Sequence, residues 1–299
     1  MSKICTLCPR NCSVDRKNGE KGICGQTAEL KVARAALHFW EEPCISGTTG
    51  SGTVFFSGCS LHCVFCQNEP IANGSVGKVI SVERLTEIFI ELERQGANNI
   101  NLVTPGHFIP AIKEALLLAK KRGLTLPVVY NTSSYESVEA LRSLEGLVDI
   151  YLPDFKYMSS QLSQKYSHAA DYAEVAKKAI AEMVRQTGQP VFDEDGEDGL
   201  IKRGTIVRHL TLPGCMDDSK KILKYLYDTY GDEIYISIMN QFTPLENVKE
   251  YPELNRRITE EEYDELIDYA IDLGIEQGFI QEGETAEESF IPDFDCNGV

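Results

Sequence analysis

Three cysteines that lie close together in the sequence have the spacing of a metal–sulfur site. Cys59, Cys63 and Cys66 form a Cys-x3-Cys-x2-Cys triplet directly after a β-like run at residues 52–57. Full cysteinyl ligation of a cubane iron–sulfur cluster takes four thiolates, so three thiolates leave one iron with an open coordination position. Substrate chemistry on a metal takes place at such open positions. The triplet therefore predicts a catalytic [4Fe–4S] site, with a zinc site lacking its fourth ligand and three buried thiols as alternatives.

The triplet resembles the signature of the radical S-adenosylmethionine (SAM) superfamily. Phe65 immediately precedes the last cysteine, and Gln67-Asn68 follow it. In that superfamily the amino and carboxylate groups of SAM chelate the fourth iron, and an electron from the cluster cleaves SAM to methionine and a 5′-deoxyadenosyl radical. The resemblance implies that SAM is the cofactor and that Phe65 belongs to its binding site.

Beyond the triplet, the chain is similar to pyruvate formate-lyase activating enzymes over most of residues 50–245. Asp154-Phe155-Lys156-Tyr157-Met158 resembles their Asp-x-Lys-x-Met motif, in which the lysine contacts SAM and the aspartate helps to bind a monovalent cation. A compact ammonium suits the methionyl carboxylate of SAM, and Asp154 would balance the charge of Lys156. The alternative is a surface salt bridge of little energetic consequence.

Two later strand segments supply further candidates for the SAM site. Arg208 resembles an activase arginine near SAM, and His209 must then point to the opposite face because side chains alternate along a strand. We therefore expect His209 to be a hydrogen-bonded packing residue. Trp40, in the linker that precedes the barrel, is also expected to pack rather than to serve the site. Met239, at the end of the last predicted strand, begins a candidate adenine-contact segment.

Two positions depart from the activase pattern. Asn131-Thr132 stands where the activases carry Asp-Thr, and the change keeps an oxygen ligand but removes a charge. Asn131 could instead cap the helix that begins near Ser137. Thr104-Pro105-Gly106-His107 stands where the activases carry a Gly-Gly-Glu-type motif for the SAM amino group. Either Thr104 and His107 or backbone carbonyls are then the expected acceptors, and the departures bear on the substrate more than on SAM chemistry.

A second group of cysteines precedes the triplet. Its members are Cys5, Cys8, Cys12 and Cys24. Four thiols in so short a segment can close a tetrahedral zinc site, and they can equally hold a second four-iron cluster that passes electrons to the first. Spacing does not separate these alternatives.

Alternating strand-like and helix-like segments must position these residues. The predicted strands are 53–57, 99–103, 127–131, 148–152, 205–212 and 234–239. The predicted helices are 82–95, 109–122, 137–144, 172–186, 219–230 and 260–273. Successive βα units favour a parallel sheet, and polar turns after nearly every strand are typical of a barrel active site. We expect an α/β fold: an incomplete (β/α)6 TIM-like barrel of the radical SAM type, whose open side could admit a large substrate.

Composition sets the remaining expectations. The 299 residues carry a formal net charge of −17, which disfavours nucleic-acid backbones as partners. The sequence shows no membrane-spanning stretch and no signal peptide, and clustered cysteines in a long chain indicate a reducing cytoplasm. We expect a Cys-rich metal-binding segment at 1–50, the barrel at 51–245, and a helix with an acidic tail packing on it at 246–299.

The resemblance also implies partners. A flavodoxin or ferredoxin would reduce the cluster, and the substrate would be a backbone glycine of a partner enzyme. A peptide, nucleotide or small metabolite is the alternative substrate. A different class of protein, an iron–sulfur electron carrier without SAM chemistry, would have no need of Asp154, Lys156 and Arg208.

Overall fold

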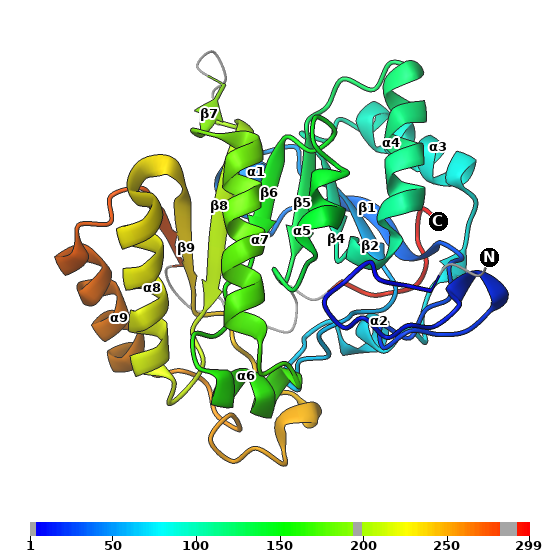
Figure 1. Ribbon diagram of the computed structural model, residues 1–299. Coiled ribbons are helices and arrows are strands. Elements are labelled where there is room, and N and C mark those ends of the chain that lie inside the picture. Colours follow the sequence, from blue (N-terminus) through cyan, green and yellow to red (C-terminus); the bar gives the residue numbers. More distant parts are fainter. Residues whose placement is uncertain (1–3, 194–198, 282–291) are drawn as a thin grey trace.

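A single mixed sheet organises the chain. The computed structural model describes residues 4–193, 199–281 and 292–299. Its strands are β1 (Lys31–His38), β2 (Ser51–Phe56), β3 (Lys78–Val79), β4 (Ile100–Val103), β5 (Val128–Thr132), β6 (Ile150–Pro153), β7 (Val191–Phe192), β8 (Ile201–Leu210), β9 (Tyr235–Met239) and β10 (Gly278–Ile280). They are hydrogen-bonded in the order β10-β9-β8-β6-β5-β4-β2-β1-β3, and β7 pairs with β8 at the side (Figure 1).

The six predicted strands are all present, and they are parallel neighbours in the sheet. β10 adds a further parallel strand beside β9. The sequence analysis did not anticipate β1, which falls within the segment expected to be merely Cys-rich and pairs antiparallel with β2. The first fifty residues therefore contribute a strand to the same sheet that carries the predicted barrel.

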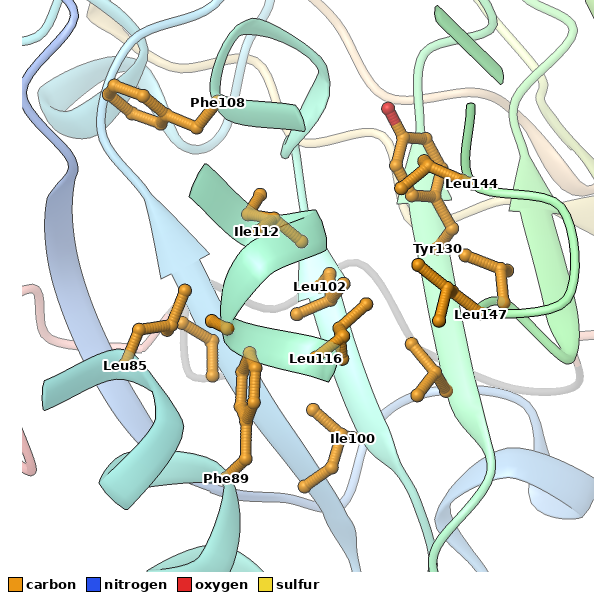
Figure 2. Close-up of a cluster of buried hydrophobic side chains, with 14 of the residues drawn as sticks. Leu85, Phe89, Ile100, Leu102, Phe108, Ile112, Leu116, Tyr130, Leu144 and Leu147 are labelled. Carbon is orange, nitrogen blue, oxygen red and sulfur yellow. The ribbon is translucent and has the colours of Figure 1, made fainter. Parts of the chain in front are cut away.

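Helices cover the outer face of the sheet (Figure 1). The longer ones are α3 (Val82–Arg94), α4 (Ile109–Lys121), α6 (Ser160–Ser167), α7 (Tyr172–Thr187), α8 (Met216–Tyr230) and α9 (Glu260–Leu273), and the short ones are α1 (Pro43–Ser46), α2 (Glu69–Ala72) and α5 (Val138–Arg142). Figure 2 shows Phe89 of α3 and Leu116 of α4 directed at Ile100 and Leu102 of β4, and all four are fully buried. This apolar contact fixes the strands from outside and leaves their inner face free for chemistry.

The inner face changes from apolar to polar along the strands. Val129 of β5 and Ile206 of β8 point inward and pack with Ile45 of α1. Two residues further on, Asn131 and Arg208 point the same way, because side chains alternate between the faces of a strand. The polar layer therefore lies toward the carboxyl ends of the strands, above an apolar floor to which α1 contributes.

The C-terminal residues 292–299 lie along β1. Backbone hydrogen bonds join Ala35 N to Asn297 O (2.9 Å) and Cys296 N to Ala33 O (2.9 Å). Most of the predicted acidic tail, residues 282–291, lies outside the described ranges. Among the helices that the structure describes, none combines the length and apolar character needed to cross a membrane.

Candidate active site

A cavity of about 450 Å³ opens on the inner face of the sheet. Its walls include the cysteine triplet and most of the residues that the sequence analysis assigned to SAM. They are Cys59, Cys63, Cys66, Phe65, Asn131, Asp154, Lys156, Arg208 and Met239. These residues come from the loop after β2 and from β5, β6, β8 and β9. The carboxyl ends of parallel strands therefore gather them as a barrel would.

The cysteine triplet forms one wall of the cavity. The thiol of Cys63 accepts a hydrogen bond from Ser167 Oγ (3.1 Å), and Cys59 Sγ accepts one from the backbone N–H of Leu61 (3.4 Å). Burial raises the pKa of the Cys63 and Cys66 thiols, so a metal must displace protons when it binds there. Phe65 is buried between Tyr157 and Phe242 and fixes the loop from below.

The triplet fits a four-iron cluster, in which each thiolate ligates a different iron. All three cysteines are free thiols facing the same cavity. In the described part of the chain, no group of three or more His, Cys, Asp or Glu side chains is arranged to hold a single metal ion.

Lys156 is held by a buried ion pair with Asp154. Its Nζ lies 2.7 Å from Asp154 Oδ2, and each side chain is only 15% exposed. Burial alone would lower the pKa of Lys156, but the attraction of Asp154 outweighs it and the pKa is raised. The surface salt bridge considered from sequence is therefore wrong. Lys156 stays charged, and it lines the same cavity as the triplet.

Arg208 is more completely engaged than Lys156. Its Nε donates to Asp154 Oδ1 (3.0 Å), its Nη1 to Glu41 Oε2 (3.0 Å) and its Nη2 to Asn131 Oδ1 (2.6 Å). Each nitrogen of the guanidinium is thus occupied by the protein. Burial would lower the pKa of Arg208, but Asp154 and Glu41 reverse the effect. Arg208 acts as the centre of a charge network rather than as a free anion binder.

Glu41 completes this network and was missed by the sequence analysis. Besides Arg208, it accepts hydrogen bonds from Asn101 Nδ2 (2.9 Å) and Asn131 Nδ2 (3.3 Å). The segment 39–43 carries it into the barrel between β1 and α1. The only signal in the sequence was the pair of acidic residues Glu41-Glu42 before Pro43, and this pair alone does not indicate which residues they contact.

Asn131 serves the network and does not cap a helix. The N-cap of α5 is Ser137, whose Oγ accepts from Ala140 N (3.3 Å). The capping interpretation of Asn131 is therefore wrong, and its amide instead bridges Arg208 and Glu41.

The segment 104–107 divides between two environments. Thr104 lines the cavity, with a positive φ of 56°. His107 is buried away from it, with Nε2 2.7 Å from Ser57 O. Burial lowers the pKa of His107 to about 4, so the ring is neutral. Of the two expected side-chain acceptors for the SAM amino group, Thr104 therefore lines the cavity and His107 does not.

Two further predictions concern His209 and Trp40. His209 is buried and its ring bonds Phe155 O and Ser219 Oγ, each at 2.8 Å, which confirms a packing role. Trp40 was expected to pack, but it is 60% exposed and lines the cavity. That expectation is wrong because the chain turns at Trp40 from the edge strand into the barrel.

The N-terminal cysteines lie near one another beside the triplet loop. A Cβ on Gly22 would lie 3.2 Å from Cys12 Sγ and 3.4 Å from Cys24 Sγ, and burial raises the pKa of Cys8 to about 12. Arg10 ties this segment to the triplet loop, because its Nε donates to Ser60 O (2.8 Å). The segment therefore buttresses the loop that carries the cluster ligands.

Comparisons with known proteins agree with this geometry. Residues 53–194 match the Radical SAM superfamily. Uncharacterized protein MJ0674 of Methanocaldococcus jannaschii is 30% identical over 280 residues, which cover 90% of this chain and 74% of that protein.

Solved structures show the same fold. Methylornithine synthase (PylB) is similar with a TM-score of 0.51 at 14% identity, over 80% of this chain and 67% of that one. The anSMEcpe protein with bound AdoMet is similar with a TM-score of 0.52 at 13% identity, over 75% of this chain and 61%, less than two thirds, of that one. At such identities the likeness shows the fold alone, a partial TIM barrel. Together with the sequence matches and the cysteine triplet, it shows that the chain belongs to the radical SAM superfamily, whose enzymes use a [4Fe–4S] cluster and SAM.

Proposed function

We propose that this protein is a radical SAM oxidoreductase that abstracts a hydrogen atom from a substrate entering the open side of the barrel. The observation that carries the proposal is the meeting of the cysteine triplet and the Lys156–Asp154 pair on one cavity. When bound, the cluster and SAM supply a 5′-deoxyadenosyl radical. Lys156 would hold the methionyl carboxylate, and Asp154 and Arg208 would hold Lys156 in place.

By resemblance to the activases, the substrate is a backbone glycine of a partner enzyme and the reductant is a flavodoxin or ferredoxin. A peptide or small metabolite is the second candidate, and the neutral Asn131 and the altered segment 104–107 favour it. We also propose a cytoplasmic location, because all ten cysteines are free thiols and reducing compartments keep them so.

The proposed role of the N-terminal cysteines is a second metal site, zinc or iron–sulfur. The supporting observation is that Cys24 interacts electrostatically with each of the other three thiols, although the described structure does not arrange them around a single metal ion. Metal analysis of the protein with the first four cysteines replaced by serine would assign it: loss of zinc alone identifies a structural site, and loss of iron and sulfide identifies a second cluster.

The function is tested by anaerobic reconstitution and incubation with SAM and dithionite. We expect 5′-deoxyadenosine and methionine, quantified by chromatography, and their loss in Cys63→Ala. Lys156→Ala should retain the iron and sulfide content and weaken SAM binding, whereas Lys165→Ala, which removes a lysine outside the cavity, should change neither. The electron-carrier alternative would be favoured if the cluster were reducible but SAM were not cleaved, either alone or with candidate substrates.

A further inference from the structure

Glu42 is a buried carboxyl group that has no ion-pair partner in the described structure. It is 8% exposed, and its Oε2 is enclosed without a hydrogen-bond partner in the described structure. Glu42 lines the cavity beside Ser237 of β9, the strand residue paired with Arg208. Buried polar atoms are nearly always hydrogen-bonded, so an unpartnered one on a cavity wall points to a ligand.

The two adjacent glutamates meet different surroundings. Glu41 turns toward β4, β5 and β8, where Arg208 and two asparagines satisfy it. Glu42 turns toward β9, where the Ser237 hydroxyl hydrogen-bonds the carboxyl group while Oε2 stays unpaired in the described structure. Burial raises the pKa of Glu42, and Arg208 opposes this only in part.

A count of charges on the cavity wall identifies what is missing. The acids are Glu41, Glu42 and Asp154, and the bases are Lys156, Arg208 and His38, whose pKa is lowered by burial. Glu41 and Asp154 are already paired with Lys156 and Arg208. Glu42 therefore has no ion-pair partner among these residues, and because a buried carboxylate without one is costly, an ammonium group beside it would stabilise its charged form.

The mouth of the cavity is apolar and aromatic. Phe39 and Trp40, which precede the glutamate pair, and Ile280 of β10 all line the cavity with half or more of their surface exposed. Aromatic faces attract cations, and apolar walls favour an apolar body. A cavity lined by apolar and aromatic residues and by an acid without an ion-pair partner fits an ammonium group carried on an apolar stem.

We propose that Glu42 binds a primary ammonium group of the substrate. The inference rests on the proposed radical SAM function, because it places the substrate in the same cavity as the cluster ligands. A free amine and the lysine side chain of a polypeptide share this chemistry. A hydrogen bond to a charged group favours the ammonium over a neutral isostere by about ten- to a hundredfold in Kd.

Trp40 makes the proposal measurable, because it is the only tryptophan of the chain and it lines the cavity. The holoenzyme with bound SAM is titrated anaerobically with benzylammonium, benzyl alcohol and phenylacetate while tryptophan fluorescence is recorded. A second series compares the dipeptides acetyl-Gly-Lys-amide and acetyl-Gly-norleucine-amide. Tighter binding of the lysine dipeptide than of benzylammonium identifies a polypeptide source, and the reverse order identifies a free amine; both support an ammonium site.

Glu42→Gln keeps the shape of the side chain and removes its charge. Glu136→Gln is the matched control, because Glu136 is also a buried glutamate with a raised pKa but does not line the cavity. We expect benzylammonium to bind the wild type at least tenfold more tightly than benzyl alcohol, with the preference lost in Glu42→Gln and kept in Glu136→Gln.

Equal binding of the three benzyl probes, preference for phenylacetate, or an ammonium preference that survives in Glu42→Gln would overturn the proposal. SAM cleavage by the wild type is measured in the same preparation. Its absence would overturn the proposed function, whereas the fluorescence titration would still report on the ammonium site. The comparison of the three benzyl probes on the wild-type protein does not need the variant, so the proposal can still be tested if Glu42→Gln folds poorly.

Discussion

Removal of the Arg208 guanidinium should destabilise the fold far more than removal of a surface arginine. In Arg208→Met, Asp154 keeps Lys156 as a partner, but Glu41 loses its only counter-charge within the described structure. The side chains of Arg208 and Glu41 are 13% and 8% exposed, so solvent screens the loss weakly. Breaking a buried ion pair by removing one partner costs about 3–5 kcal/mol, and methionine fills most of the vacated volume.

Urea denaturation of anaerobically purified protein, followed by circular dichroism, measures this loss through the midpoint and slope. Arg84→Met is the matched control: Arg84 pairs with Glu91 at 2.7 Å, but the side chains are 31% and 45% exposed, and such a pair contributes less than about 1 kcal/mol. The double variant Arg208→Met/Glu41→Gln removes the orphaned charge and should recover about 2 kcal/mol.

Equal losses in Arg208→Met and Arg84→Met would refute the reasoning, because the network would then contribute no more than a solvated pair. Failure of Glu41→Gln to relieve Arg208→Met would locate the cost elsewhere, in packing rather than in charge.

Three further perturbations test the surroundings of the site. Burial raises the pKa of Glu136 to about 7, whereas the pKa in the unfolded chain is about 4.3. The folded protein therefore holds an extra proton between these two pH values and loses stability as the pH rises from about 4.3 to about 7. Glu136→Gln should lack this decline in urea titrations and should be more stable than wild type by roughly 2–3 kcal/mol at pH 8. Ser167→Ala removes the donor to Cys63 Sγ and should lower the reduction potential of the reconstituted cluster in an EPR-monitored titration, whereas Tyr157→Phe, which leaves the serine in place, should lower it less. Gly106→Ala would bring a Cβ within 2.4 Å of Glu136 Oε2 and should cost about 1–3 kcal/mol of unfolding free energy, with an unchanged urea midpoint counting against the close contact.

The parts of the site that lie close together in the sequence were predictable, and the parts assembled over long separations were not. The triplet spans only residues 59–66 and was identified by its spacing, and Asp154 and Lys156 follow a recognisable strand in a short segment that resembles the activase motif. Glu41 meets its partners across 60, 90 and 167 residues. A carboxylate has no sequence signature for such partners, since any buried polar donor can satisfy it.

The strands show the same division. Runs of β-branched residues between amphipathic helices identified six parallel strands, because burial on both faces leaves a continuous apolar signal. β1 lies at the antiparallel side of the sheet, next to the short β3, and its sequence, Lys31–His38, mixes small, basic and apolar residues. β3 is the edge strand and pairs with only two residues of β1, so β1 needs no continuous apolar run and its pattern carried no strong strand signal.

Asn131 and Glu41 are best understood together. Where the activases that the chain resembles carry an aspartate, Asn131 offers Arg208 a neutral oxygen at 2.6 Å and turns its amide toward Glu41 at 3.3 Å. An aspartate could accept from Arg208 but could not donate to Glu41, and it would place two carboxylates in contact. Besides Asp154, Glu41 supplies a negative charge to Arg208, and it comes from the segment between β1 and α1. That segment also delivers Glu42, Trp40 and Phe39 to the cavity. The same short stretch of chain therefore supplies a counter-charge for the SAM side of the site and the surface that a substrate would meet.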